Sequence, residues 1–121
     1  MMTKDNLHIY ASTEGITIMI DDRKNVVGQI NISKERIPRK INGENKYFWY
    51  FNRLFVKADY RNKGYAKFLL SKMVDILEKE KINLWLDINP YGDLNYDQLE
   101  ELYMRYGFKK YDYGYILINE E

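Results

Sequence analysis

The residues with the clearest chemical potential lie in one short turn between an apolar stretch and an amphipathic one. Arg61, Gly64 and Ala66 occur there in the pattern Arg-x-x-Gly-x-Ala. Small residues let the backbone approach a ligand closely, and a helix start offers unpaired N–H groups and the positive end of the helix dipole. This combination predicts an anion site, most naturally one for phosphate.

Two elements must position this turn. The aromatic stretch 47–56 is long and apolar, which predicts a central strand leading into the turn. From residue 63 to about 81, apolar residues recur at helical spacing with charged residues on the other side, which predicts an amphipathic helix. A further strand is predicted over 84–88, followed by a break at 90–93.

A second helix is predicted after this break. Asn95 followed by Gln98 is a helix-capping pattern, and an apolar stripe with Leu99, Leu102 and Tyr103 follows it. Gly107 is expected at the position just past the helix end. Two last strands are predicted at 108–111 and 115–118, joined around Gly114.

The part of the chain before residue 47 predicts three strands and a loop. Strands at 7–12, 16–20 and 26–32 with two very short connections predict an antiparallel meander. The polar and basic segment 33–46 contains Pro38 and Gly43 and predicts a mobile loop.

The predicted order of elements defines the fold class. The strand–helix–strand crossover at 48–88 predicts a parallel pair inside an otherwise antiparallel sheet. The expected fold is therefore α/β (α+β), with a mixed, mostly antiparallel sheet of about seven strands and two main helices. Residues 1–121 are expected to form one domain.

Composition excludes several function classes. The chain has no cysteine, so disulfides, thiolate metal ligands and a cysteine nucleophile are excluded, and no metal site is predicted. Nineteen basic and 18 acidic residues give a net charge of +1, which offers no reason to expect a nucleic-acid partner. No apolar run approaches the roughly 20 residues of a membrane span, and no signal-peptide pattern is found. The expectation is a cytoplasmic enzyme or binding module without a membrane partner.

Two motifs together resemble the GCN5-related N-acetyltransferase (GNAT) family. Val56, Arg61, Gly64 and Ala66 match the family pattern Val-x-Pro-x-x-Arg-x-x-Gly-x-Gly/Ala, with Ala58 where proline is common. About 40 residues later, a second motif, Leu-Tyr-x-x-x-Gly-Phe, is present. It is formed by Leu102, Tyr103, Gly107 and Phe108. The similarity covers roughly residues 47–110, and the second motif looks most like the short phage- and plasmid-borne branch of the family.

The resemblance implies an enzyme that transfers acetyl from acetyl-CoA to an amine. It implies that the backbone N–H groups of 62–66 hold the CoA pyrophosphate and that the side chains of Arg61 and Lys63 add charge. It also implies that Leu54, Phe55 and Val56 pair with the pantetheine amides as a missing strand would. The Leu54 amide would donate to the thioester carbonyl, where attack by an amine creates an oxyanion that needs a fixed donor. The implied cofactor-binding residues are Leu54, Phe55, Val56, Arg61, Asn62, Lys63, Gly64, Tyr65, Ala66, Asn89 and Tyr103.

Tyr103 falls where family members place a tyrosine next to the CoA sulfur. A thiolate leaving group benefits from a proton, and a phenol with an unperturbed pKa near 10 stays protonated at neutral pH. The resemblance thus implies a general acid. The alternative interpretation is a tyrosine packed in the core on the apolar stripe of its helix.

The proton acceptor is not assigned by the resemblance. Several family members use a glutamate four residues before the oxyanion amide, but that position is Tyr50 here, and the stretch 47–56 contains no carboxylate. Water relayed through Tyr50, Asn52 or backbone carbonyls, or a carboxylate such as Asp87 or Asp93, are the alternatives that stay open.

Two further departures concern the cofactor and the acceptor. Many members carry a CoA-contacting asparagine seven residues before the tyrosine. That slot is Tyr96, and the neighbouring Asn95 is better explained as a helix cap, which leaves Asn89 as the CoA candidate. Family members also place two helices between their first two strands, whereas only 13–15 separates them here. The acceptor cleft should therefore be wide, which favours a bulky acceptor such as a protein lysine or a chain N-terminus.

The sequence is also compatible with functions other than acetyl transfer. A CoA-binding sensor or interaction module without turnover is the main alternative, because the strand lacks a carboxylate. The aromatic and basic residues of 47–63 would also suit base stacking, but a strand buried on both faces gives the same pattern. His8 has no predicted role. The basic run 34–40 is expected to be a solvated loop, with contact to the CoA 3′-phosphate or an acidic partner as the alternative.

Overall fold

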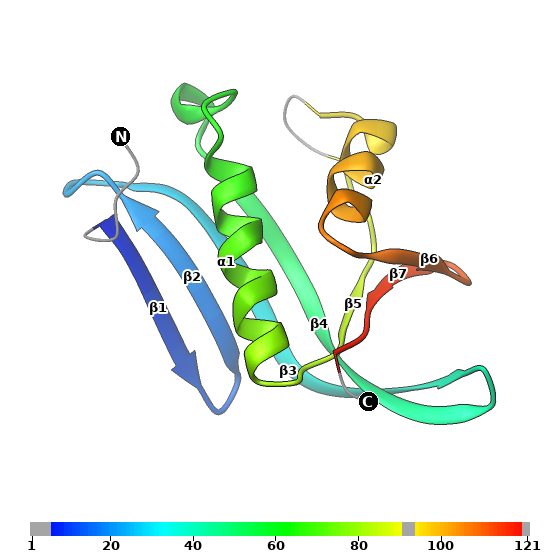
Figure 1. The fold of residues 1–121 in the computed structure, drawn as a ribbon. Helices are drawn as coiled ribbons and strands as arrows, with labels where there is room; N and C mark the ends of the chain where they lie inside the picture. The colour runs from blue at the N-terminus through cyan, green and yellow to red at the C-terminus, as the bar shows by residue number, and fades with distance from the viewer. Residues whose placement is uncertain (1–5, 91–93, 120–121) are drawn as a thin grey trace.

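Seven strands form one mixed sheet in a computed structural model that describes residues 6–90 and 94–119 (Figure 1). Their spatial order is β1-β2-β3-β4-β5-β7-β6. The strands are β1 Leu7–Ser12, β2 Gly15–Asp21, β3 Val26–Ile41, β4 Glu44–Val56, β5 Leu84–Leu86, β6 Lys109–Tyr111 and β7 Gly114–Leu117. Among these residues β4 and β5 pair in parallel and the other neighbours pair antiparallel. The predicted fold class is therefore confirmed.

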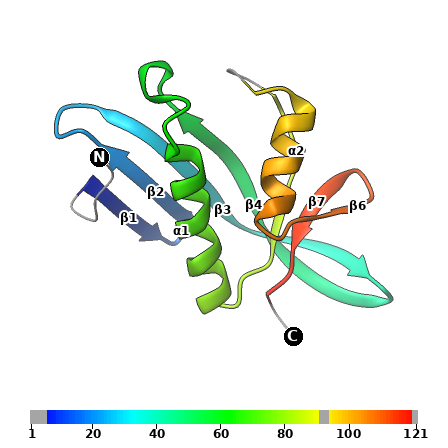
Figure 2. The same cartoon turned by 45° about the horizontal axis from the view of Figure 1, so that its top comes forward.

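Both α-helices lie on one face of the sheet, as Figures 1 and 2 show. They are α1 Tyr65–Lys79 and α2 Tyr96–Arg105, and a short 3-10 helix, η2 Ala58–Tyr60, precedes α1. Helix α1 buries Leu69, Leu70, Met73 and Leu77 in a core shared with β2, β3 and β4. Full burial of each such side chain contributes about 1.5–3 kcal/mol. Among the described residues, no helix has the length and apolar character needed to cross a membrane.

Helix α2 begins and ends where the sequence predicts. The Asn95 side chain accepts a hydrogen bond from the Gln98 N–H at 2.9 Å, and the Gln98 side chain accepts one from the Asn95 N–H at 2.9 Å. These two bonds form a complete capping box, which confirms Asn95 as a helix cap. At the other end, Gly107 has a φ of 100° just past the C-cap residue Tyr106, as the predicted stop requires.

Substitution of the cap tests this account. Asn95→Ala removes one partner of the capping box and should lower the free energy of unfolding by about 1 kcal/mol. Urea unfolding measures the change. Asn45→Ala is the matched control, because Asn45 is an exposed residue of β4 outside any helix. Equal losses for the two variants would contradict a capping role.

The prediction of a mobile loop over 33–46 is wrong. Strand β3 continues to Ile41, and β4 starts at Glu44, so the two strands form one long hairpin paired as far as Ile41↔Glu44. The hairpin turn is Asn42–Gly43, with φ values of 51° and 85°. Asn-Gly at these angles is a strong hairpin turn, and its twist suits the flanking strands.

The basic residues of this segment lie on the hairpin rather than in a loop. The Arg36 guanidinium lies 4.0 Å from the centre of the Tyr47 ring, and that of Arg39 lies 4.6 Å from the centre of the Trp85 ring. Pro38 is exposed within β3, opposite Tyr47. A predicted turn also shifts, because β6 and β7 join through Asp112 and Tyr113, whereas Gly114 lies inside β7.

The far end of the hairpin has its own small core. Ile41 and Phe48 are buried there with Trp85 of β5 and Ile116 of β7. Along β5, Leu84 and Leu86 belong to the main core under the helices, so the alternation of a strand places Trp85 on the opposite face. The hairpin thus covers the back of β5 and β7, which explains why a polar segment is ordered as strand.

Candidate functional site

One cavity of about 610 Å³ lies between α1, α2 and the end of β4. This is within the size range of small-molecule sites. Its wall includes the turn before α1, through Arg61, Asn62 and Gly64, and also Leu102 and Tyr103 of α2. The two motifs that the sequence singled out, some 40 residues apart, therefore face the same space.

The turn before α1 has the geometry of an anion site. Asn62 and Gly64 both have left-handed backbones, with φ values of 63° and 85°. Gly64 is the N-cap residue, and it caps the helix without a side-chain hydrogen bond. The first helical bond runs from the Phe68 N–H to the Gly64 carbonyl at 3.0 Å, so the preceding N–H groups of the first turn point out of the helix end. Such N–H groups, with the helix dipole, favour a bound anion.

Arg61 braces this turn. Its Nε–H donates to the Val56 carbonyl at 3.0 Å, which ties the turn back to the end of β4. The Lys63 ammonium lies 5.7 Å from the centre of the Tyr60 ring, and Tyr60 lines the cavity whereas Lys63 does not. Of the two basic side chains, Arg61 alone lines the cavity among the described residues.

A second contact fixes the turn from the side of the β2–β3 connection. The Tyr60 hydroxyl donates to the Asp22 carboxylate at 2.7 Å, and the Tyr60 ring packs edge-on against that of Tyr65. This hydrogen bond, followed by those from the N–H groups of Asn25 and Lys24, lowers the pKa of Asp22 to about 2. It also raises the pKa of Tyr60.

The pH dependence of this contact is a test. A carboxyl group whose folded pKa lies below its unfolded value contributes stability above the unfolded pKa and loses it as the pH falls. For Asp22 the loss should run from about pH 4 down to about 2. Tyr60→Phe should raise the pKa of Asp22 toward 3.8, as measured by carbon NMR of the carboxyl group. Tyr113→Phe, at a fully exposed side chain, should leave it unchanged.

Strand β4 changes its register where it meets the cavity. Leu54 pairs with Ile30, whereas Phe51 pairs with Ile32, so β4 has one extra residue at this point. This β-bulge at Asn52 bends the strand locally. Phe51, Asn52 and Leu54 all line the cavity, and Leu54 is one of the cofactor-binding residues that the resemblance implies.

Strands β4 and β5 separate close to this β-bulge. Within the described chain they pair through Trp49↔Leu84 and Tyr50↔Trp85, and a further bond joins the Trp49 N–H to the Asn83 carbonyl at 2.9 Å. Strand β5 ends at Leu86, whereas β4 continues to Val56. Beyond Tyr50, no further β4–β5 residue pair occurs among the described residues, and the next part of β4 contributes Phe51, Leu54 and Val56 to the cavity wall. Such a divergence of two strands is an arrangement in which an extended ligand can pair with a sheet.

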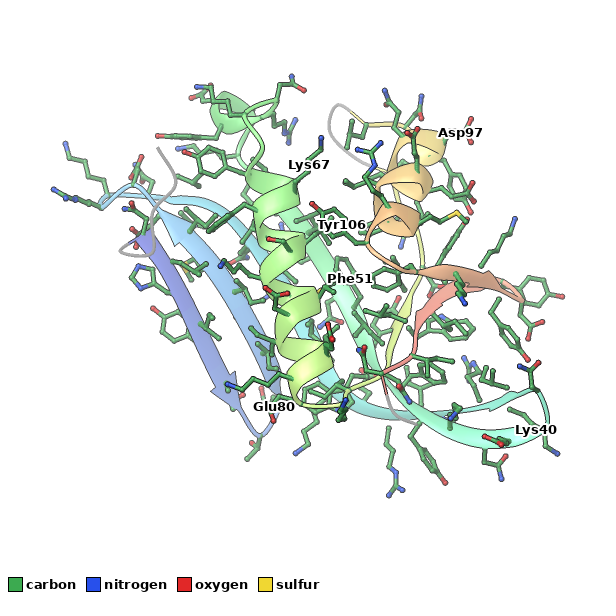
Figure 3. All side chains as sticks on the ribbon, viewed as in Figure 1. Lys40, Phe51, Lys67, Glu80, Asp97 and Tyr106 are labelled. Atoms are coloured by element: carbon green, nitrogen blue, oxygen red, sulfur yellow. The ribbon has the colours of Figure 1, made fainter. Side chains whose placement is uncertain are left out.

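Tyr103 lies in the inner wall of the cavity. Its side chain is 5% exposed, and its ring packs edge-on against Phe51 of β4 at 5.6 Å and against Phe108 at 5.9 Å. In Figure 3, Phe51 lies between the two helices. The same residue is thus both a packed core tyrosine and part of the cavity wall, so the two interpretations of Tyr103 do not exclude each other.

Helix α2 is held at both ends. Near its start, the Tyr115 hydroxyl of β7 donates to the Glu100 carboxylate and is hydrogen-bonded to the Tyr96 hydroxyl at 2.9 Å. Past its end, the Tyr106 hydroxyl donates to the Lys67 carbonyl of α1 at 3.1 Å; Figure 3 labels both residues. These links fix the distance between the helices and hence the width of the cavity.

The other residues singled out in the sequence differ in whether they line the cavity. Val56, Tyr65, Ala66 and Asn89 line the cavity, whereas Phe55 and Lys63 do not. His8 Nε2 lies 2.8 Å from an Asp21 carboxylate oxygen, on strands β1 and β2, and neither residue lines the cavity. The candidate base Asp93 lies outside the described residues.

The cavity wall also contains residues outside the set of cofactor-binding residues that the resemblance implies. Gln98, Glu101 and Arg105 line it from α2, and Glu101 pairs with Arg105 at 2.9 Å. Asp87, one of the open alternatives for a base, lines it just after β5. Helical spacing from Leu102 identifies the first three as neighbours on α2, but no local pattern indicates that Asp87 meets β4.

No cluster of metal-ligating side chains occurs within residues 6–90 and 94–119. The site's polar groups are instead backbone N–H groups, hydroxyls, amides and a few charged side chains. Backbone N–H groups suit the binding of an anionic ligand. Hydroxyls and charged side chains elsewhere on the cavity wall suit proton transfer.

A family model matches most of the sequence. Residues 13–110 match a model described as an acetyltransferase (GNAT) domain. No curated protein matches the sequence significantly.

Solved structures with a similar fold include three of interest. A GNAT acetyltransferase from Brucella melitensis in complex with acetyl-CoA has 22% identity and a TM-score of 0.60, with 90% of this chain and 61% of that chain covered. The ribosomal-protein-S18-alanine N-acetyltransferase from Escherichia coli has 14% identity and a TM-score of 0.68, with 98% and 84% covered. A mutant of the toxin AtaT, bound to the antitoxin AtaR C-terminus and acetyl-CoA, has 12% identity and a TM-score of 0.64, with 87% and 67% covered. The chain thus spans less than two thirds of the Brucella protein.

Proposed function

Since this chain belongs to the GNAT acetyltransferase family, we propose that it transfers the acetyl group of acetyl-CoA to a primary amine. The observation that carries the proposal is the single cavity lined both by the turn before α1 and by Tyr103. The similar structures from Brucella melitensis and of AtaT contain acetyl-CoA, which supports this donor.

The proposed cofactor position follows the length of the cavity. The CoA pyrophosphate lies at the N–H groups of 62–66, where the helix dipole favours negative charge. The pantetheine arm runs along the β4 edge at Leu54, Phe55 and Val56 and takes main-chain hydrogen bonds where β5 has ended. In this position Asn89 is a further contact, and the thioester reaches the inner wall near Tyr103.

Two groups of this chain act on the thioester in the proposed mechanism. The Leu54 N–H donates to the carbonyl oxygen and stabilises the negative charge that develops on it during amine attack. The Tyr103 hydroxyl gives a proton to the departing thiolate. Tyr103 is held by ring contacts with Phe51 and Phe108, so its hydroxyl is kept in a defined place.

The acceptor is proposed to be a bulky amine, such as a protein lysine or a chain N-terminus. Two residues, Thr13 and Glu14, separate β1 from β2, so no helices between these strands narrow the approach. The Escherichia coli protein of similar fold acts, by its name, on an alanine of a ribosomal protein. We further propose that residues 1–121 form one domain, and that the chain belongs to the short phage- and plasmid-like branch.

A CoA-release assay with a panel of amines and lysine peptides tests the function, together with calorimetry of acetyl-CoA binding. Binding and amine-dependent CoA release would support the transferase. Binding without release from any amine would instead favour a CoA-binding sensor or interaction module. Absence of binding heat would refute the proposed cofactor site.

A further inference from the structure

Asp87 is held by two donors at the point where β4 and β5 separate. The Tyr50 hydroxyl donates to Asp87 Oδ2 at 3.1 Å, and the Trp85 indole N–H donates to Oδ1 at 3.2 Å. Tyr50 and Trp85 are themselves paired across the two strands. Each carboxylate oxygen therefore has one fixed hydrogen bond, and each retains room to accept another.

Asp87 lies between the main cavity and the small core on the face of the sheet away from the helices. Tyr50 and Trp85 belong to the small core on that face, and Asp87 contacts both while it also lines the main cavity. Asp87 itself is exposed. Asp87 is therefore an exposed carboxylate on the wall of the same cavity that Tyr103 lines.

Other ionisable groups surround this carboxylate. From β3, the Arg39 guanidinium lies over the Trp85 ring at 4.6 Å, and the negative charge of Glu35 acts on Tyr50. Burial, followed by the hydrogen bond to Asp87, raises the pKa of Tyr50, so Tyr50 remains a donor at neutral pH. Asp87 is thus the acceptor in both of its side-chain hydrogen bonds, from the Tyr50 hydroxyl and the Trp85 indole N–H.

The other described carboxylate on the cavity wall is already paired. Glu101 accepts from Arg105 one helical turn away at 2.9 Å, on the exposed side of α2. Strand β4 has no carboxylate between Tyr47 and Val56. Among the described residues, Asp87 is thus the carboxylate that combines a place on the cavity wall with fixed neutral donors.

On the basis of the proposed function, we propose that Asp87, positioned by Tyr50 and Trp85, takes the proton from the acceptor ammonium. The amine lone pair then attacks the thioester carbonyl carbon, a C–N bond forms, and negative charge develops on the carbonyl oxygen. Collapse breaks the C–S bond, and the thiolate takes a proton from Tyr103. Solvent accepts the proton from Asp87 and also the second N–H proton of the attacking nitrogen, and it returns one proton to Tyr103, so the reaction yields neutral amide, free thiol and one released proton.

Kinetics with Asp87→Asn test this assignment. With Nα-acetyl-lysine amide as acceptor, kcat/KM should fall about 100-fold at pH 7, within the range of general base catalysis. Acetyl-CoA affinity should be unchanged. The loss should shrink as the pH approaches 10, because an unperturbed lysine has a pKa of about 10.4 and the amine then arrives neutral. Asp75→Asn, at an exposed position of α1, is the matched control and should behave as wild type.

Tyr50→Phe separates positioning from proton transfer. This variant keeps the ring in the small core but removes the bond to Asp87 Oδ2. We expect about a tenfold fall in kcat with acetyl-CoA affinity unchanged, because Asp87 remains present but is less well oriented.

A spectroscopic measurement needs no turnover. The chain has two tryptophans, and the Trp85 indole N–H reports on Asp87, whereas Trp49 serves as an internal reference. In the CoA-bound protein, Nα-acetyl-lysine amide should shift the NMR signal of the Trp85 indole N–H and leave the signal of the Trp49 indole N–H in place. Asp87→Asn should abolish the shift.

Two results would overturn the assignment while leaving the proposed function intact. One is a wild-type rate for Asp87→Asn, or a loss that is equal at every pH. The other is an unmoved Trp85 resonance at saturating amine in a protein that binds acetyl-CoA and turns over. Failure of the function itself would appear differently, either as no binding heat with acetyl-CoA or as binding without CoA release from any amine.

Discussion

Gly64→Glu should raise the Kd for acetyl-CoA by about 100-fold or more, equivalent to about 2.7 kcal/mol of binding free energy. Two physical effects combine in this variant. Gly64 has a φ of 85°, a conformation that costs a residue with a side chain about 1–2 kcal/mol. The new carboxylate also lies at the N–H groups proposed to hold the pyrophosphate, where it occupies the site and repels the ligand. Calorimetry measures the change.

Gly43→Glu is the matched control for this substitution. Gly43 also has a φ of 85°, in the hairpin turn between β3 and β4, and a side chain there would meet nothing within 4 Å. The two variants add the same charge at the same backbone conformation, but Gly43 is absent from the cavity wall. Acetyl-CoA affinity should therefore be retained in Gly43→Glu. Retained affinity in Gly64→Glu would refute the position of the pyrophosphate.

Tyr103→Phe should lower kcat by about 10²–10³-fold, since proton transfer to a leaving group contributes on this scale. The phenyl ring keeps the contacts with Phe51 and Phe108, so the wall of the cavity should be preserved. The Kd for acetyl-CoA should accordingly change by no more than about twofold. Steady-state kinetics and calorimetry on the same preparation give the two quantities.

Tyr111→Phe controls for the loss of a hydroxyl. The Tyr111 hydroxyl donates to the Lys40 carbonyl at 2.8 Å on the far hairpin, and Tyr111 is not part of the cavity wall. Its loss should leave kcat unchanged. A parallel fall of kcat and acetyl-CoA affinity in Tyr103→Phe, or no change in either, would show that Tyr103 is a packing residue and not the acid.

Features encoded by neighbouring residues could be predicted from the sequence. The capping box of Asn95 and Gln98 is made within one helical turn, so its residue types identify it without knowledge of the fold. The left-handed Gly64 and the helix behind it are local in the same way. The resemblance of two sequence motifs to the GNAT family predicted that distant segments share a ligand, and the structure places residues of both motifs on the wall of one cavity.

The hairpin was mispredicted because two local signals conflict. Pro38 and the basic residues of 33–41 indicate a loop, whereas Asn42–Gly43 indicates a hairpin turn. What decides between them is burial of Ile41 and Phe48 against Trp85 and Ile116. Those partners are far away in the chain, so tertiary packing overrode the local composition.

Asp87 illustrates the same limit within the site. Its donor Tyr50 is 37 residues earlier and reaches it only because β4 and β5 pair in parallel with Tyr50 beside Trp85. A change of one residue in that register would place Tyr50 on the other face. The type of each residue can be read from the sequence, but their meeting requires the register.

The short β4–β5 pairing has a consequence for how the molecule comes apart. Among the described residues, two residue pairs and the bond from the Trp49 N–H to the Asn83 carbonyl join the strands β1–β4 to β5, so opening between β4 and β5 breaks few backbone hydrogen bonds. Partial unfolding follows the regions of lowest local stability. A molecule bound to α1 on one side and α2 on the other acts as a clamp, and its binding free energy adds directly to the cohesion of the two halves. The resistance of this protein to partial unfolding is then set by the concentration of its cofactor as much as by its own sheet.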